Sequence, residues 1–581
     1  MSISDLDRTR KNAYVYALAN AAKFGGKARA EAVHGRLMAE IRGAISAEEM
    51  KKVAEETVSL VNSMSQVDQL KELSRLAPKL LEQKKKEKEV KELPALPNAD
   101  RYSKIVMRLA PYPSGPLHIG NARMAILNDE YVKRYRGELI LAYDDTIGSV
   151  EKYIVPEAYD LIKDGLDWLG VDIDKIVYKS DRISIFYEWA RVLLERNFAY
   201  VCLCEAEALR RNRGLGVECP CRNSSKETNL DRWDKMLGGF YDEGEAVVRL
   251  KTDMKHPNPA FRDRVLLRVS RRVHPRVGDR YRVWPMLEFS WAIDDDLLGI
   301  THILRGKDLA IEDMMEIFLW NLFGWNAPEI IHHGLLQISG TKLSKTKART
   351  MINNKIYSGW DDPQTWSLQS LRRRGIRPEA LREFVLQFGL SLSEVTVPLD
   401  NLYALDKKLI DPTSDRYVFV RDPVKLTIND MPGRIENEIP RHPDLPARGF
   451  KRFSITPEPD RSVTLLISRD DLKLLEVSKY VRLIDLCNLR VVKVGERGVQ
   501  CVYYSADHRD AQGLNAPLLQ WLQLEDTFPA RVFMPDGTRQ EGSAELQCTK
   551  LDVGTVIQFI RFGFVRIDKK DHEIDAFFAH N

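Results

Sequence analysis

A strand-like stretch that runs into a turn rich in proline and glycine, and from there into a helix, constrains this chain more than any other part of its sequence. The apolar Ile105-Val-Met leads into Arg108-Leu-Ala-Pro-Tyr-Pro-Ser-Gly-Pro-Leu-His-Ile-Gly-Asn121. A helix N-terminus presents free backbone N–H groups and partial positive charge, which suit a phosphate. Gly120 has no side chain, so a nucleotide can approach the backbone there. The string therefore predicts a nucleotide site in a strand-to-helix turn.

Two polar residues of this turn are expected to bind the nucleotide. His118 and Asn121 are three positions apart, on one side of a helical turn, so both can hydrogen-bond the phosphates of one ATP. An ordinary turn with an incidental histidine is the alternative, and the string His-Ile-Gly-Asn alone would not exclude it. The other residues of the turn that we expect to border ATP are Pro111, Ser114, Gly115 and Gly120.

A glycine-led loop with two lysines, Gly340-Thr-Lys342-Leu-Ser344-Lys345-Thr, is the second motif. The ammonium groups of Lys342 and Lys345 can follow negative charge as it builds on pyrophosphate leaving ATP, and Ser344 lies between them. Alone, the loop is equally a solvated lysine loop. Its place beyond a second region of alternating strands and helices favours the ATP interpretation.

A chain of 581 residues is too long for one hydrophobic core, so we expect several domains. Changes in the pattern of apolar residues along the sequence predict where they begin and end. Helical periodicity gives way at Pro94 and Pro97 to strands that alternate with helices, which predict a parallel sheet. Short β-branched stretches between turns later predict antiparallel barrels. The expected parts are a helical N-terminal extension (1–93), the first half of a parallel-sheet domain (100–200), an irregular insertion (201–285), the second half of that domain (286–350), a helical linker (351–410) and a β-barrel region (411–581).

Four of the seven cysteines lie in the expected insertion as two Cys-x-Cys pairs, Cys202 with Cys204 and Cys219 with Cys221. Four thiolates suit tetrahedral zinc, and a loop of this length can bring the pairs together. Free, reduced thiols are the alternative. An odd cysteine count with this bunching is typical of a reducing cytoplasm rather than of a disulfide framework.

Local clusters of arginine indicate a nucleic-acid partner, which the net charge of +4 does not do by itself. Such clusters suit phosphate contacts, although we expect about half of these arginines to pair with neighbouring acids. The candidates are Arg268, Arg271 and Arg272 at the end of the insertion, and Arg372, Arg373 and Arg374 in the linker.

No apolar run reaches the roughly 18–20 residues that a membrane-spanning helix needs, and the N-terminus lacks the apolar core of a secretory signal. We therefore expect a cytoplasmic protein without a membrane partner.

The two motifs together resemble the "HIGH" and "KMSKS" signatures of class I aminoacyl-tRNA synthetases, with Asn121 in place of the second histidine. Gly359-Trp-Asp-Asp-Pro and Leu371-Arg-Arg-Arg-Gly-Ile resemble the glutamyl/glutaminyl subgroup in its archaeal and eukaryotic form. The resemblance covers about residues 100–581, and the N-terminal helices resemble an extension of archaeal members. It implies a Rossmann-type catalytic domain with an inserted domain that meets the acceptor end of tRNA, and β-barrels that meet the anticodon.

The resemblance also implies roles for single residues. His118, Asn121, Lys342 and Lys345 match the positions that bind ATP and stabilise the leaving pyrophosphate. In the amino-acid site, Arg108 and Arg305 match arginines and Asp144 matches the acid that receives the α-ammonium group. This set complements glutamate, which carries two carboxylates and one ammonium. The alternative for each residue alone is an ordinary ion pair.

The implied reaction is the activation of L-glutamate by Mg-ATP and its transfer to the terminal ribose of tRNA(Glu), an RNA rather than a DNA partner. The tRNA for glutamine, which many archaeal relatives also charge, remains open as a second substrate. Ala142, Ile147-Gly148 and Leu287 depart from the usual pattern, Leu287 by replacing a tyrosine, and they leave glutamine as the rival amino acid. The rivals from other classes are a small-molecule nucleotidyltransferase and a tRNA-binding scaffold without catalysis.

Overall fold

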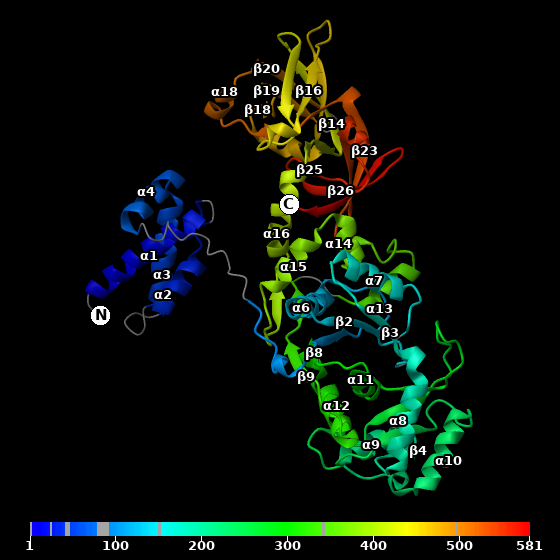
Figure 1. Ribbon diagram of the computed structural model, residues 1–581. Helices are drawn as coiled ribbons and strands as arrows, with labels where there is room; N and C mark the ends of the chain where they lie inside the picture. The colour runs from blue at the N-terminus through cyan, green and yellow to red at the C-terminus, as the bar shows by residue number, and fades with distance from the viewer. Residues whose placement is uncertain are drawn as a thin grey trace. The chain divides into compact units, whose positions relative to one another are not determined.

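The computed structural model describes residues 3–23, 26–40, 47–77, 92–148, 153–339, 343–495 and 498–581, and Figure 1 shows their helices and strands. The chain divides into two compact units, Met1–Val90 and Lys91–Asn581. None of the described helices is long and apolar enough to cross a membrane.

The first unit is helical, as its periodicity predicts. It consists of α1 (Ile3–Lys23), α2 (Ala30–Glu40), α3 (Ala47–Asn62) and α4 (Gln66–Leu76). Alanine, valine and leucine side chains from all four helices form one core. α3 and α4 are separated at Ser65, whose hydroxyl caps α4 by accepting a hydrogen bond from the Asp68 N–H. Residues 78–91 of the expected N-terminal extension lie outside the described part of the chain.

The second unit contains the predicted parallel strands. In the first group, β1 (Val106–Leu109), β2 (Glu138–Tyr143) and β3 (Lys175–Tyr178) pair side by side; in the second, β8 (His302–Gly306) pairs with β9 (Glu329–His333). Thr301 joins the groups, because its N–H donates to the Val106 carbonyl at 2.9 Å and its hydroxyl oxygen accepts from the Val106 N–H at 2.9 Å. The crossover helices are α6 (Ile119–Tyr135), α7 (Ala158–Trp168) and α12 (Ala310–Phe323).

The segment expected to be irregular is in fact well structured, so that prediction is wrong. Between the two parallel groups, β4 (Ala199–Cys202), β5 (Val247–Leu250), β6 (Val265–Val269) and β7 (Val283–Pro285) form an antiparallel sheet. The helices that accompany it are α8 (Ile183–Glu195), α9 (Ala206–Leu215) and α10 (Lys226–Leu237). The strands are short and carry arginines such as Arg249, which is buried, so they lack the apolar alternation by which a strand is usually predicted.

After the sheet, α11 (Leu287–Leu297) leads back to the parallel strands. The remaining elements before the C-terminal region are β10 (Leu336–Ile338), α13 (Lys345–Asn353), α14 (Leu368–Arg374), α15 (Pro378–Leu386), β11 (Val395–Val397), which pairs with β10, and α16 (Asp400–Ile410).

The C-terminal region is built of mainly antiparallel sheets, as predicted (Figure 1). One seven-stranded sheet has the order β12 (Arg416–Tyr417), β25 (Val556–Phe559), β26 (Gly563–Lys570), β27 (Ile574–His580), β23 (Thr527–Phe533), β24 (Arg539–Glu545), β13 (Phe419–Arg421). The other has the order β21 (Leu518–Leu519), β18 (Tyr480–Leu483), β19 (Asn488–Gly495), β20 (Gly498–Ser505), β14 (Pro423–Asn429), β17 (Val463–Ser468), β22 (Leu522–Gln523).

Smaller elements complete this region: the hairpin β15 (Ile435–Pro440) with β16 (Phe450–Ile455), and the helices α17 (Leu472–Val477) and α18 (His508–Gly513).

Candidate active site

The first motif forms the predicted strand-to-helix turn, and its two polar residues close the N-terminus of α6. The Gly120 N–H donates to His118 Nδ1 at 3.1 Å, and the His118 N–H donates to Asn121 Oδ1 at 3.2 Å. This reciprocal arrangement satisfies N–H groups that a helix otherwise leaves free. Asn121 therefore has a capping role in this structure, beside the phosphate contact expected from the sequence.

The protonation state of His118 follows from its surroundings. Burial and the nearby Lys345 charge lower the pKa of His118 to about 4, so the ring is neutral near pH 7. Since Nδ1 accepts a hydrogen bond, the ring proton lies on Nε2. A neutral imidazole in this tautomer is a hydrogen-bond donor to a phosphate oxygen at Nε2.

Two glycines of the motif make room for neighbouring side chains. Gly115 has φ +149°, and a Cβ built there would lie 2.8 Å from the Trp360 ring. A Cβ on Gly120 would lie 3.0 Å from His118 Cε1 and 3.2 Å from Leu343 Cδ1. The space next to Gly120 thus borders the second motif, to which Leu343 belongs.

The second motif contacts the first although the two lie far apart in sequence. Lys345 Nζ donates to the Gly115 carbonyl at 3.3 Å, and burial lowers the pKa of Lys345 to about 8. Ser344 caps α13 by accepting a hydrogen bond from the Lys347 N–H at 3.3 Å. The expected contribution of Lys342 falls on Gly340–Lys342, which lie outside the described residues. The arrangement places one desolvated ammonium group beside the turn where phosphates are expected.

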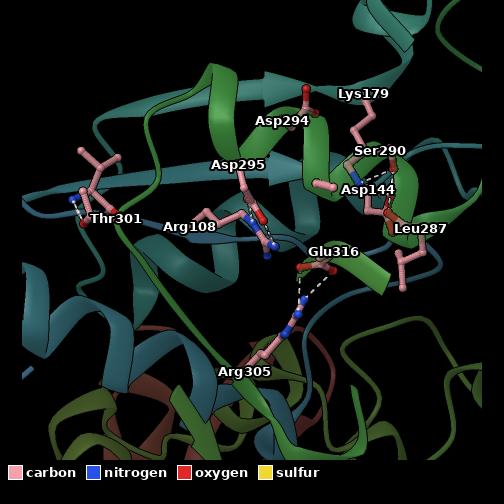
Figure 2. Close-up of polar contacts among 12 residues, drawn as sticks. Arg108, Asp144, Lys179, Leu287, Ser290, Asp294, Asp295, Thr301, Arg305 and Glu316 are labelled. Atoms are coloured by element: carbon pink, nitrogen blue, oxygen red, sulfur yellow. Dashed lines mark hydrogen bonds and ion pairs between the residues drawn. The ribbon is translucent and has the colours of Figure 1, made fainter. Parts of the chain in front are cut away.

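The first predicted arginine of the amino-acid site is held by a carboxylate of the protein. Arg108 on β1 forms a two-pronged ion pair with Asp295 on α11, Nε to Oδ1 and Nη2 to Oδ2, the latter at 2.7 Å (Figure 2). Arg108 is 5% exposed and Asp295 is fully buried. A substrate carboxylate must therefore share this guanidinium with Asp295.

The second predicted arginine is held in the same way, by two carboxylates of α12. Arg305 on β8 donates from Nη1 and Nη2 to the two oxygens of Glu316 at 3.0 and 2.9 Å, and from Nε to Asp313 at 2.7 Å. His332 on β9 approaches the other oxygen of Asp313 at 2.7 Å. Burial raises the pKa of Glu316 to about 7, against the lowering effect of Arg305.

The predicted acid, Asp144, follows β2 and is buried together with a lysine. Lys179 Nζ lies 3.1 Å from Asp144 Oδ1 and donates to Ser290 Oγ at 2.7 Å. Lys179 is fully buried. Where the sequence predicts the α-ammonium group of the substrate, the structure therefore has a cation of its own beside Asp144 (Figure 2).

Trp291 on α11 lies among these groups. Its ring centroid is 4.7 Å from the Arg108 guanidinium carbon, 5.2 Å from that of Arg305 and 5.1 Å from Lys179 Nζ, so three cations interact with one aromatic ring. The ring is 5% exposed, and its indole N–H has no hydrogen-bond partner among the described residues. Leu287, one helical turn earlier, provides no hydroxyl. The indole N–H is thus a buried donor that the described residues leave unused.

Most residues of this cluster were not predicted from the sequence. One signal was present: an Asp-Asp-Asp run ends α11, in which most neighbouring residues are buried and apolar. The others had no distinguishing sequence pattern. The residues missed are Lys179, Trp291, Asp295, Asp313 and Glu316.

The four predicted metal ligands come together at the edge of β4. The Cys202 and Cys219 sulfurs are 3.6 Å apart, and those of Cys204 and Cys221 are 3.9 Å apart. The sulfurs of Cys202, Cys204 and Cys221 all lie within 4.8 Å of one another. Tetrahedral zinc with Zn–S bonds of about 2.3 Å holds its sulfurs about 3.8 Å apart, a spacing that both close pairs match. Cys219 lies outside the mutually close group of three, and its sulfur is 3.5 Å from the Tyr200 hydroxyl and from Arg249 Nη1, so it would have to move to complete a tetrahedral set.

The linker arginines differ from the surface patch that the sequence predicts. Arg374 is fully buried and donates to the carbonyls of Phe578 at 3.0 Å and Ala579 at 2.6 Å, so its assignment to tRNA binding is wrong. It fastens α14 to the C-terminal strand instead. Arg372 pairs with Asp164 at 2.9 Å and Arg373 with Asp568 at 2.8 Å.

The arginines in and just after β6 are partly engaged with the protein. Arg268 donates to the Ile147 carbonyl at 3.4 Å, Arg271 pairs with Asp242, and Arg272 lies 5.8 Å from the Tyr153 ring. Arg271 is exposed, so its pairing with an equally exposed acid is weak enough for a phosphate to compete.

Comparison with known proteins assigns the family. The family described as "tRNA synthetases class I (E and Q), catalytic domain" matches residues 104–412, and the one described as "tRNA synthetases class I (E and Q), anti-codon binding domain" matches residues 414–506. The chain therefore belongs to the class I tRNA synthetases of the E and Q group.

Named relatives match almost the whole chain. Glutamate–tRNA ligase from Pyrococcus horikoshii is 43% identical over 98% of this chain and 99% of its own length. The protein of the same name from Pyrococcus abyssi is 43% identical over 97% of this chain and 98% of its own, and that from Methanocaldococcus jannaschii is 42% identical over 96% and 97%.

Proposed function

We propose that the chain is a glutamate–tRNA ligase, which activates L-glutamate with ATP and transfers it to the terminal ribose of tRNA(Glu). The observation that carries the proposal is the contact between the two motifs, in which Lys345 reaches Gly115 beside the His118 turn. The names of the near-full-length relatives support glutamate as the amino acid. They favour this function over glutamine activation, a small-molecule nucleotidyltransferase and a scaffold without catalysis.

The reaction follows from where the charges lie. The glutamate α-carboxylate attacks the α-phosphate of Mg-ATP, the bond to pyrophosphate breaks, and glutamyl-adenylate forms. The Lys345 ammonium and the His118 Nε2–H stabilise charge that develops on the phosphates. The terminal ribose hydroxyl of tRNA then attacks the acyl carbon, and AMP leaves. Because positioning and charge stabilisation carry both steps, no nucleophilic side chain takes part.

The tRNA contacts are part of this proposal. Arg268 in β6, and Arg271 and Arg272 just after that strand, would meet the phosphates of the acceptor end. Arg372 and Arg373 on α14 would form a second contact. The sheets within residues 411–581 would bind the anticodon, in keeping with the family match of residues 414–506.

The proposed activity is tested by ATP–pyrophosphate exchange with each of the twenty amino acids, with and without tRNA. We expect glutamate to support the fastest exchange. Faster exchange with glutamine would replace the glutamyl by the glutaminyl assignment, and exchange with none of them would remove ligase activity altogether.

We also propose that Cys202, Cys204, Cys219 and Cys221 hold one structural zinc ion, which would tie the end of β4 to the segment after α9. Metal analysis of the purified protein should then find about one zinc per chain. Cys219→Ser should lose the metal and make the segment from Cys202 to Cys221 more sensitive to protease. Cys501→Ser, a buried cysteine of the C-terminal region, is the control and should keep the metal. Four freely titratable thiols in a metal-free wild-type protein would rule the zinc site out.

A further inference from the structure

The second arginine of the proposed amino-acid site, Arg305, is ion-paired with two carboxylates of the protein itself. Both Nη atoms of Arg305 donate to the two oxygens of Glu316, at 3.0 and 2.9 Å, and Nε donates to Asp313 at 2.7 Å. Glu316 is fully buried and Arg305 is 3% exposed. The two Nη atoms of Arg305 that would bind a substrate carboxylate are therefore already bound to the carboxylate of Glu316 (Figure 2).

The other charged groups that face Glu316 do not displace it from the Arg305 guanidinium. Arg108 on β1 favours ionised Glu316, but it is bound to Asp295 on α11, whose charge disfavours ionised Glu316. Asp313, on the same helix as Glu316, shares Arg305, and His332 on β9 contacts Asp313 rather than Glu316. A substrate side chain that brings one more negative charge would add repulsion in a buried cluster, where Coulomb interactions are strong.

We propose that Glu316 is a specificity-determining residue that holds Arg305 in the empty enzyme and releases it to the glutamate side chain by taking up one proton. The proton comes from solvent and binds a Glu316 oxygen, and the guanidinium then pairs with the γ-carboxylate of the substrate. The charge of the cluster is thereby unchanged on binding. This inference rests on the proposed function, because it assumes that glutamate is the amino acid.

The coupling makes the affinity for glutamate depend on pH and leaves that for glutamine independent of it. Since burial raises the pKa of Glu316 to about 7, the residue is mostly protonated below that pH and glutamate binds without further proton uptake. Above pH 7 each bound glutamate must bring a proton, so its affinity should fall by up to about tenfold per pH unit. A glutamine amide can accept from Arg305 and donate to ionised Glu316, and it needs no proton. The preference for glutamate should therefore narrow as pH rises.

The test compares the Michaelis constants for glutamate and glutamine in ATP–pyrophosphate exchange from pH 6 to pH 9. In the wild-type protein the constant for glutamate should rise above pH 7 while that for glutamine stays level. Glu316→Gln should flatten the glutamate profile and lower its Michaelis constant at pH 8 by about tenfold, because a neutral amide no longer competes as an anion for the two Nη atoms of Arg305. The matched control is Glu312→Gln on the same helix, which pairs with Arg264 at 3.2 Å and should keep the wild-type profile.

A second measurement needs no variant. Titration calorimetry of glutamate binding in buffers of different ionisation enthalpy counts the protons taken up. We expect close to one proton per glutamate at pH 8 and none per glutamine. Glutamate binding without proton uptake at pH 8, or a Glu316→Gln profile that follows the wild type, would overturn the role of Glu316. Proton-coupled glutamate binding without any pyrophosphate exchange would instead overturn the proposed function and leave the role of Glu316 standing.

Discussion

Replacing Lys345 by alanine should slow the formation of glutamyl-adenylate roughly 30- to 1000-fold, because the loss of one positioned charge from the transition state costs about 2–4 kcal/mol. The ammonium group lies in a desolvated position 3.3 Å from the Gly115 carbonyl, beside the turn that receives the phosphates. The affinity for tRNA and the stability of the fold should change little, since this side chain makes a single hydrogen bond to the described residues.

The effect is measured by single-turnover activation with saturating ATP and glutamate. Lys347→Ala is the control, because Lys347 is exposed on the same helix and contributes its backbone N–H to the Ser344 cap. It should react at a near-normal rate. The wild-type rate at subsaturating ATP should also decline above pH 8, because the lowered pKa of Lys345 means that the free enzyme loses the ammonium charge there. Near-normal activation by Lys345→Ala would contradict the role given to the second motif.

Replacing Arg108 by leucine should lower the free energy of unfolding by about 3–5 kcal/mol, because it leaves the Asp295 carboxylate buried without a partner. The double variant Arg108→Leu with Asp295→Leu should recover most of that loss, since it removes both charges. The measurement is urea denaturation of the three proteins, compared by their midpoints and slopes.

This result matters for how substrate recognition is tested. If the single variant unfolds easily, a raised Michaelis constant for glutamate reports damage to the fold as much as a lost substrate contact. The double variant separates the two effects. A single variant as stable as the wild type would show that Arg108 and Asp295 are not paired as the structure has them.

Local patterns were enough to predict the framework of the site. The apolar run before Arg108, the prolines of the turn and the periodic helix after His118 act over a few residues, and the structure contains each of them. The parallel sheet followed from the alternation of strands and helices. The contact between Lys345 and Gly115 spans 230 positions and was not predicted. Only a shared ATP role of the two motifs was expected, from their resemblance to the class I signatures and from the place of the second motif along the chain.

The partners of the predicted residues could not be found in this way. Asp295 and Glu316 meet Arg108 and Arg305 because α11 and α12 pack against each other next to β1 and β8, which is a property of the tertiary structure. The arginine run ending at Arg374 led to a wrong prediction for Arg374, because neighbouring arginines on a helix point in different directions. In sequence it suggests a basic surface patch, but α14 turns its last arginine toward the carbonyls of the C-terminal strand. Charge runs on helices have to be divided by face before they indicate a binding surface.

The most direct test of the central claim is the charging of a tRNA(Glu) transcript by the purified protein with ATP and an equal mixture of glutamate and glutamine. The aminoacylated end is released with nuclease and the attached amino acid is identified by mass. We expect glutamyl-adenosine as the main product, formed only when ATP and the transcript are both present. Glutaminyl-adenosine as the main product, or no charging with either amino acid, would contradict the assignment.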